Sequence, residues 1–433
     1  MLKQEINELL TRTGPGTAMG NLFRQYWIPA LLAEELPEPG SPPVRVKLLS
    51  ERMIAFRDKD GRYGLIDEFC AHRGASLWFG NSETADDEAP GLRCAYHGWK
   101  YDVTGQCVEV PSEPDNSTFC QKVKLTSYPL VKVGDVLWTY MGDPARQPEL
   151  PEFEWVRVPP EQTYTSKRWQ ESNWLQALEG GIDSSHVSWL HNAGLKNDPL
   201  FKGSKGNEYN LGDMRPFFEV VESDGGLFVG VRRNAEEDSY YWRITPWVMP
   251  SFTMVPPRGD HPVHGHFWVP IDDENCWVFT FDYLPVRALT ADERQAMKDG
   301  HGVHNEYVPG TYRPLQNKDN DYMMDRAAQR RGETFSGVKG IAMQDASLQE
   351  SMGPIVDRSR ERLVSADSGI IKARRKLVNA AIALRDEGIE PPGVRPAHQR
   401  VRSVATVLPK DASFLESCRE GLTATPGVRQ TSV

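Results

Sequence analysis

The chain has 433 residues, a formal net charge of −10 and 39% hydrophobic residues, including 12 Trp. This length predicts two domains with a sizeable core. Acidic and basic residues are interspersed without a basic stripe, which argues against a nucleic-acid-binding protein. No apolar run reaches the length of a membrane span, and no signal peptide is evident. Six scattered cysteines are not a disulfide framework, so a reducing cytoplasm is the expected location.

The first segments predict an N-terminal arm over residues 1–43. Residues 3–12 predict a short helix that ends at Gly14-Pro15-Gly16. The aromatic-rich segment 21–29 is interpreted as a packing arm, and a Pro-rich stretch follows it.

A β pattern begins at Val44. Short runs bounded by turn residues predict antiparallel strands over 44–48, 53–56 and 63–66. Residues 131–140 predict a closing hairpin, and a Pro-rich linker follows it. We therefore expect a small β domain over 44–145.

Residues 146–433 form the second predicted domain, which begins with a strand-like run over 163–165 and a helical stretch from Trp174 to His191. Later runs predict a broad antiparallel sheet, with strands over 226–231, 240–244, 251–255, 265–269 and 277–281. Helices are predicted over 288–299, 319–330 and 354–387, and the tail after Pro409 shows weak periodicity. The fold class is α+β, with a β domain followed by a larger domain of an antiparallel sheet flanked by helices.

Two short clusters carry metal-ligand residues. They are Cys70-Ala71-His72 and Cys94-Ala95-Tyr96-His97, separated by 21 residues. Two Cys and two His suit a [2Fe–2S] cluster of the Rieske type, in which imidazoles replace two thiolates on one iron. Zinc is the alternative, although a zinc finger usually pairs like ligands in each half. Each half is mixed here, which favours two irons that each take one kind of ligand from both loops. With the Arg-Gly and Gly-Trp that follow, these loops resemble those of Rieske iron–sulfur proteins.

A second candidate metal site lies in the segment that contains Asp183, His186 and His191. Residues at i and i+5 lie about 140° apart on a regular helix, so the helix must widen or break for both imidazoles to meet one metal. Two His and one carboxylate form the facial triad of non-haem Fe(II) oxygenases, which leaves positions open for O2.

Together the two motifs resemble the catalytic subunit of ring-hydroxylating Rieske oxygenases. The resemblance implies that a late Asp completes the triad, and we assign Asp345, with Asp357, Asp325 and Glu350 as alternatives. It also implies that Asp183 links a cluster-bound His of one subunit to an iron-bound His of its neighbour. The expected assembly is a homotrimer or a stacked pair of trimers.

The resemblance extends over nearly the whole chain and is strongest to oxygenases of the phthalate 4,5-dioxygenase and 3-chlorobenzoate dioxygenase type. It implies cis-dihydroxylation of an aromatic carboxylate, phthalate or a substituted benzoate. O2 is the co-substrate, and an FMN/[2Fe–2S] reductase supplies electrons from NAD(P)H. One alternative is a monooxygenase or O-demethylase of a methoxy- or aryloxy-benzoate. Another is a pure electron carrier, a Rieske ferredoxin with an appended binding domain.

An anionic substrate needs a cation in an apolar pocket, and Arg grips carboxylate well. Arg243 lies among aromatic strand residues and is the first candidate, while Arg233 and Arg215 are weaker ones. The alternative role for Arg243 is a buried structural ion pair. Other candidate pocket residues are Ser184, Ser185, Val187, Phe252 and Trp268. Gly180-Gly181 stands where the resembled family often has Asn or Gln, which leaves the local hydrogen bonding open.

Overall fold

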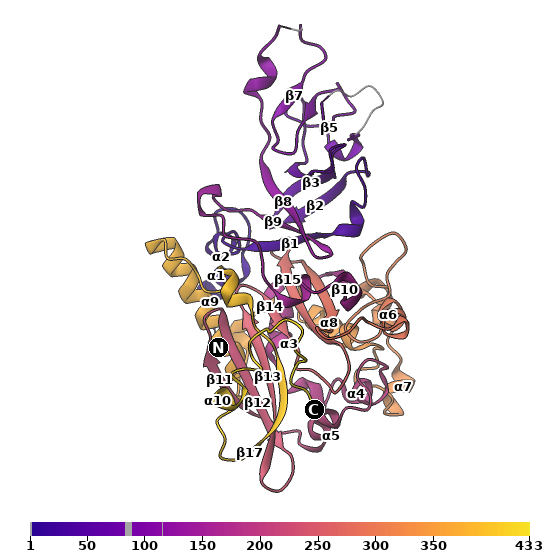
Figure 1. The fold of residues 1–433 in the computed structure, drawn as a ribbon, viewed down its shortest axis with the longest axis vertical. Coiled ribbons are helices and arrows are strands. Elements are labelled where there is room, and N and C mark those ends of the chain that lie inside the picture. The colour runs from indigo at the N-terminus through magenta and orange to yellow at the C-terminus, as the bar shows by residue number, and fades with distance from the viewer. Residues whose placement is uncertain (1, 83–88, 115) are drawn as a thin grey trace. The chain divides into compact units, whose positions relative to one another are not determined.

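The computed structural model describes residues 2–82, 89–114 and 116–433 (Figure 1). It contains two compact units. The smaller unit is Phe23–Pro148. The larger unit comprises the N-terminal segment that ends at Leu22 and the segment Glu149–Val433. Both are built on antiparallel sheets, as the α+β class predicts.

The smaller unit contains a six-stranded sheet in the order β1-β9-β8-β4-β3-β2. Its strands are β1 (Trp27–Leu32), β2 (Val44–Leu48), β3 (Glu51–Arg57), β4 (Tyr63–Asp67), β8 (Ser127–Val133) and β9 (Val136–Tyr140). A second, three-stranded sheet is formed by β5 (Leu92–Arg93), β6 (Lys100–Tyr101) and β7 (Cys107–Glu109). The predicted ligand clusters lie in loops that follow β4 and β5.

The expected N-terminal arm, residues 1–43, is not a separate unit. Residues 27–32 form β1, in which every residue is buried and which pairs with β9 in the smaller sheet. Helix α1 (Gln4–Thr11) instead belongs to the larger unit, where Asn7 accepts a hydrogen bond from Arg358 at 3.0 Å. Helix α2 (Ala18–Phe23) lies between these segments in the chain. A single sequence does not show which sheet a lone apolar strand will join.

The larger unit is organised around an eight-stranded sheet in the order β10-β16-β15-β14-β13-β12-β11, with β17 also paired to β13. The strands are β10 (Thr163–Gln170), β11 (Phe217–Glu222), β12 (Gly226–Asn234), β13 (Ser239–Val248), β14 (Phe252–Met254), β15 (Val263–Pro270), β16 (Cys276–Tyr283) and β17 (Val404–Pro409). The predicted strands between residues 226 and 281 all lie in it, whereas β11 and β17 were not predicted.

Helix α3 (Trp174–Ile182) packs on this sheet beside β15 and also contacts α8 (Ile341–Ser351). Two glycines at the end of α3 permit this packing. A Cβ added at Gly181 would overlap the Trp268 ring, and one added at Gly180 would overlap the Gln349 amide. Gly180-Gly181 therefore lets α3 lie close to both β15 and α8.

The remaining helices are α4 (Asn192–Asn197), α5 (Lys205–Gly212), α6 (Ala291–Lys298), α7 (Arg326–Arg330), α9 (Ser368–Glu387) and α10 (Phe414–Cys418). The helix predicted over 354–387 begins only at Ser368. Before it, the buried Arg358 forms an ion pair with Glu179 of α3 at 3.1 Å, and the segment follows short 3₁₀ turns. The helix predicted over 319–330 is a kinked 3₁₀ turn followed by α7.

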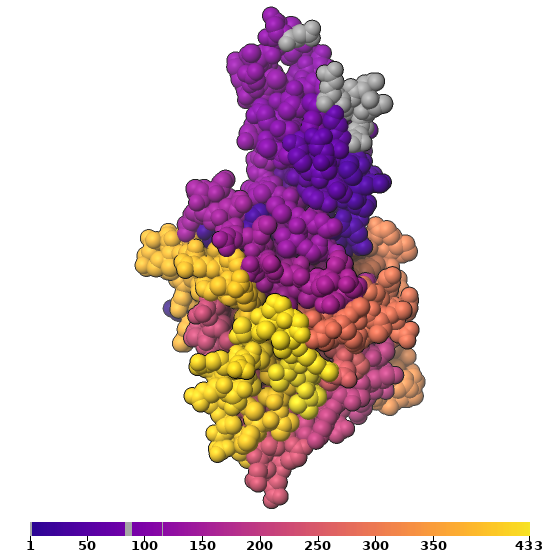
Figure 2. Space-filling model, in the orientation of Figure 1, coloured from indigo at the N-terminus to yellow at the C-terminus, as the bar shows by residue number. Residues whose placement is uncertain are grey.

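The tail after Pro409 packs on the larger unit despite its weak periodicity. Phe414 of α10 is buried against Trp242, with ring centroids 4.8 Å apart. Figure 2 shows this C-terminal segment, in yellow, as a continuous part of the surface of the larger unit. Among the described residues, no helix is long and apolar enough to cross a bilayer.

Candidate active site

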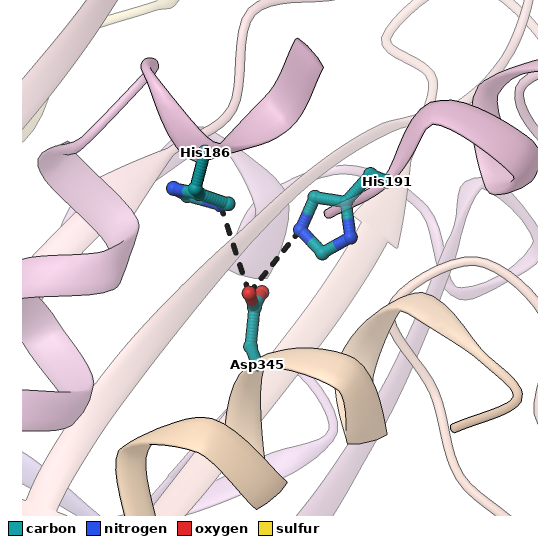
Figure 3. A group of neighbouring side chains, drawn as sticks. All are labelled: His186, His191 and Asp345. Carbon is teal, nitrogen blue, oxygen red and sulfur yellow. Dashed lines mark ion pairs between the residues drawn. The ribbon is translucent and has the colours of Figure 1, made fainter. Parts of the chain in front are cut away.

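His186, His191 and Asp345 come together in the larger unit (Figure 3). One potential ligand atom from each lies within 4.8 Å of the others. Asp345 Oδ1 lies 3.2 Å from His191 Nε2 and 3.6 Å from His186 Nε2. Both imidazoles point towards the carboxylate, which projects from α8 (Figure 3). Two imidazoles and one carboxylate on one side of a point form a donor set that suits Fe(II) and leaves open positions.

The two imidazoles meet because the helix breaks between α3 and α4. Asp183 follows α3 in an extended conformation, and a 3₁₀ turn begins at His186. His191 then precedes the first residue of α4. The predicted break is therefore present, as an extended residue and a 3₁₀ turn rather than a π-bulge.

Asp183 orients the His186 ring. The Asp183 Oδ2 atom lies 3.0 Å from His186 Nδ1, and Asp183 Oδ1 accepts a hydrogen bond from the Ser185 amide at 2.7 Å. Burial would raise the pKa of Asp183, but the hydrogen bond from His186, the His186 charge and the backbone amides together hold the pKa below its ordinary value. Asp183 therefore stays ionised and turns His186 Nε2 towards Asp345.

His191 has a partner of a different kind. Its Nδ1 lies 2.9 Å from Gln344 Oε1, while Gln344 Nε2 donates to the Val338 carbonyl at 3.1 Å. A carbonyl can only accept, so the amide orientation is fixed and Gln344 Oε1 must face the imidazole. His191 therefore carries a proton on Nδ1, and its Nε2 atom is the one that faces Asp345 and can bind a metal. The sequence analysis did not single out Gln344, although it directly precedes Asp345.

Charge on the three residues also suits a cation. Burial would raise the pKa of Asp345, but His191 and His186 hold it at about 2. Burial would lower the pKa of His186, yet the hydrogen bond to Asp183 and the charge of Asp345 raise it to about 9. A bound metal would therefore displace a proton from His186.

The other carboxylates considered as ligands have different partners. Asp357 caps a 3₁₀ turn through the Ser359 amide, and Asp325 caps the start of α7. Glu350 accepts hydrogen bonds from Tyr322 and from the Glu171 amide. The structure thus brings Asp345, and not these three, to the two imidazoles.

A buried cavity adjoins the three residues, and Arg243 lines it. The Arg243 side chain is 2% exposed, and its Nε and Nη1 atoms have no hydrogen-bond partner among the described residues. Arg233 is also buried, but its guanidinium is bound by Ser184 and by the Asp213 carbonyl. Arg215 is exposed and does not line this cavity. Only Arg243 of the three predicted arginines thus offers free donors to a ligand.

Some of the other predicted pocket residues line the cavity and some do not. Ser184, Val187 and Trp268 line the cavity, whereas Ser185 does not. Phe252 lies instead in the core, with its ring centroid 4.3 Å from that of Phe153.

Two further arginines line the cavity, and the sequence analysis did not identify them. Arg168 lies on β10 and Arg258 in the loop after β14, and each is 5% exposed. In both, Nε and Nη1 lack a partner among the described residues. Burial and the charge of Arg243 lower the pKa of Arg258 to about 9. Alternation along β10 could have indicated that Arg168 faces inward, but nothing in a Pro-Pro-Arg-Gly turn marks Arg258.

In the smaller unit, the two predicted cluster loops have matching backbone geometry. The Gly74 amide donates to the Cys70 carbonyl at 2.9 Å, and the Gly98 amide to the Cys94 carbonyl at 3.0 Å. Gly74 and Gly98 have φ values of +74° and +76°, which only glycine adopts readily. Each loop is thus a tight turn that begins at a cysteine.

The ligand side chains of these loops separate by type. Cys70 and Cys94 are buried and interact with each other. His72 and His97 lie nearer the surface, with ring centroids 4.4 Å apart. The Tyr101 hydroxyl lies 3.2 Å from Cys70 Sγ. Two thiols on one side and two imidazoles on the other fit a Rieske cluster, in which each iron takes one kind of ligand.

Comparisons with known proteins agree with both units. A Rieske [2Fe–2S] domain model matches residues 26–129, and a model described as "LigXa C-terminal domain like" matches residues 139–420. The chain therefore belongs to the Rieske non-haem iron oxygenases and is the oxygenase (alpha) subunit of such an enzyme.

Two relatives align over almost their whole length. The chain is 37% identical to the 3-chlorobenzoate-3,4-dioxygenase oxygenase subunit of Comamonas testosteroni, over 91% of this chain and 92% of the relative. It is 35% identical to the phthalate 4,5-dioxygenase oxygenase subunit of Pseudomonas putida, over 96% and 94% respectively. The crystal structure of dicamba monooxygenase shares the fold, with a TM-score of 0.57 and 19% identity over 84% of this chain and 99% of that one.

Proposed function

We propose that the chain binds one ferrous iron through His186, His191 and Asp345, and a Rieske cluster through Cys70, His72, Cys94 and His97. When bound, the iron supplies O2 chemistry and the cluster supplies electrons. The geometry of both donor sets and the family membership support this proposal. The protein contributes ligand orientation, a water-poor cavity and substrate positioning.

The proposed substrate is an aromatic carboxylate, and the proposed reaction is cis-dihydroxylation. The observation that carries this substrate class is the buried, unpartnered guanidinium of Arg243 in the cavity beside His186 and Asp345. A buried guanidinium without an anion is costly, whereas a carboxylate can accept two of its N–H groups. Relatives named for 3-chlorobenzoate and phthalate support the same class. The reaction balances as one aromatic double bond, O2, two electrons and two protons giving two C–O bonds.

The test is a single turnover of chemically reduced holoprotein with labelled O2 and a panel of benzoates and phthalates. A dihydrodiol that contains both labelled atoms supports the proposal. One labelled atom in a phenol would replace it with the monooxygenase alternative. An unlabelled phenol formed from a methoxybenzoate, together with formaldehyde that carries one labelled atom, would replace it with the O-demethylase alternative. Arg243→Met should lose carboxylate binding, whereas Arg215→Met, at an exposed position, should keep it.

We further propose that an FMN/[2Fe–2S] reductase supplies electrons from NAD(P)H and that the chain works as a homotrimer or a stacked pair of trimers. In such a ring, Asp183 of one subunit faces a cluster ligand of its neighbour. Head-to-tail interfaces of this kind close into rings. The cluster-bearing His72 and His97 edge is not deeply buried within one chain, which leaves it available to a neighbour.

Mixed oligomers test whether electrons pass from the cluster of one subunit to the iron of its neighbour. Asp183→Asn should keep both metals and lose turnover, and Cys70→Ser should lose the cluster. In co-expressed mixed rings, one of the three interfaces combines an intact cluster with an intact Asp183, so about a third of the activity should return. If electrons passed only within one chain, every chain would carry a defect and the mixed rings would stay inactive.

A further inference from the structure

Three buried arginines face the cavity, more than one carboxylate needs. Arg168, Arg243 and Arg258 are each at most 5% exposed, and each has two guanidinium nitrogens without a partner among the described residues. Asp345 is one of the acids whose charge acts on Arg168, and a ferrous iron would take up that negative charge. The cavity therefore holds more positive charge than its own acids balance.

The arginines lie at two ends of the cavity. At one end, Arg258 lies near Arg243 and stacks over the Phe201 ring at 4.6 Å. At the other, Arg168 projects from β10, with its Nη2 3.3 Å from Gln170 Oε1. The register aligns Arg168 with Val278 of β16 and Trp268 of β15, so Arg168 and Trp268 lie on the same face of the sheet and both line the cavity.

The sheet order separates the two ends. Three strands, β16, β15 and β14, lie between β10 and β13, which carries Arg243. Four inter-strand steps of about 4.8 Å place the backbones of β10 and β13 roughly 19 Å apart. Sheet curvature and the inward reach of the two side chains make the distance between the guanidinium groups shorter than this. Two acid groups on adjacent ring carbons lie too close together to engage arginines at both ends.

We propose that the substrate is an elongated aromatic diacid, with one acid group bound between Arg243 and Arg258 and the other bound by Arg168. The acid groups occupy opposite ends of one ring or of two linked rings, and the ring between them lies beside His186 and Asp345. This inference rests on the proposed function, because it assigns both ends of the same substrate cavity.

The test measures dissociation constants on anaerobic holoprotein without reductant, so that no turnover occurs. The probes are benzoate, benzene-1,2-dicarboxylate, benzene-1,4-dicarboxylate and biphenyl-4,4′-dicarboxylate. Benzene-1,4-dicarboxylate, biphenyl-4,4′-dicarboxylate or both should bind at least 10-fold more tightly than benzoate and than the 1,2-isomer. Equal or tighter binding of benzoate or the 1,2-isomer would overturn the diacid inference alone. No binding of any probe would overturn both this inference and the proposed substrate class.

Variants at each end then separate the subsites. Arg168→Gln should weaken binding of the preferred diacid at least 10-fold and change benzoate binding by less than 3-fold. Arg168→Lys, which keeps the charge, should recover part of the loss, and Arg243→Gln should weaken both ligands. Arg215→Gln is the matched control, because Arg215 is exposed and lies outside the cavity. Equal weakening of diacid and benzoate by Arg168→Gln would contradict a separate second subsite.

Discussion

The Gln344 side-chain oxygen lies 2.9 Å from Nδ1 of His191, directly beside the carboxylate that faces His191 on its other nitrogen. Consecutive residues of α8 thus serve the two sides of one imidazole. Gln344 fixes the ring and its proton, and Asp345 approaches Nε2. His186 is held in the same manner by Asp183, so each imidazole has one partner at Nδ1 and faces the shared point with Nε2.

Replacement of Gln344 by Leu should weaken Fe(II) binding about 10–100-fold, because the lost hydrogen bond frees His191 to rotate or change tautomer. Competition with a coloured chelator measures this affinity. Gln316→Leu is the control, since Gln316 bonds the Lys339 carbonyl and does not touch His191. An unchanged Fe(II) affinity in Gln344→Leu would contradict the orienting role.

Gly181→Ala should destabilise the larger unit by about 1–3 kcal/mol, because the added methyl overlaps the Trp268 ring and pushes α3 away from β15. The displacement of α3 should lower the unfolding temperature. It should also weaken substrate binding, because Trp268 lines the cavity. Gly212→Ala is the matched control, because no atom lies within 4 Å of the added Cβ. Similar melting of the two variants would show that α3 tolerates the displacement.

Glu179 should make stability depend on acid pH. Burial would raise its pKa, but the charges of Arg358 and Arg374 outweigh burial and lower it. A folded-state pKa below the unfolded value stabilises the protein above the ordinary Glu pKa of about 4.3, and this stabilisation is lost as the pH falls through and below that value. Removal of one partner from such a buried cluster costs about 3–5 kcal/mol.

The measurement is the unfolding temperature of wild type and Glu179→Gln at pH 7, 5, 4 and 3. The variant should melt lower at pH 7 and 5, and the gap between the two proteins should narrow as the pH falls below about 4.3. Glu333→Gln serves as control, because its ion pair with Arg331 is exposed and should contribute little. A gap that stays constant with pH would mean that Glu179 does not carry the acid dependence.

The sequence predicts the parts of this site that depend on spacing. The mixed Cys and His loops, and the helix break needed between His186 and His191, follow from ligand chemistry and helical geometry. The structure contains both features, and it brings Asp345 to the imidazoles as the family resemblance implies.

What the sequence does not predict depends on contacts between distant segments. Residues 27–32 form a strand only because β9 pairs with them, and residues before Ser368 lose their helix where Arg358 reaches Glu179. Arg168 and Arg258 become binding candidates only when the sheet and the loop after β14 close one cavity around them. Arg233, equally buried, is removed from that set by contacts with Ser184.

The central claim is that one chain carries two separate iron centres with the assigned ligands, and iron and sulfide analysis of purified protein tests it most directly. Wild type should contain about three irons and two sulfides per chain, and Asp345→Ala should retain about two irons with an unchanged Rieske spectrum. Zinc in place of iron and sulfide, or an iron content that Asp345→Ala leaves at the wild-type value, would contradict the account.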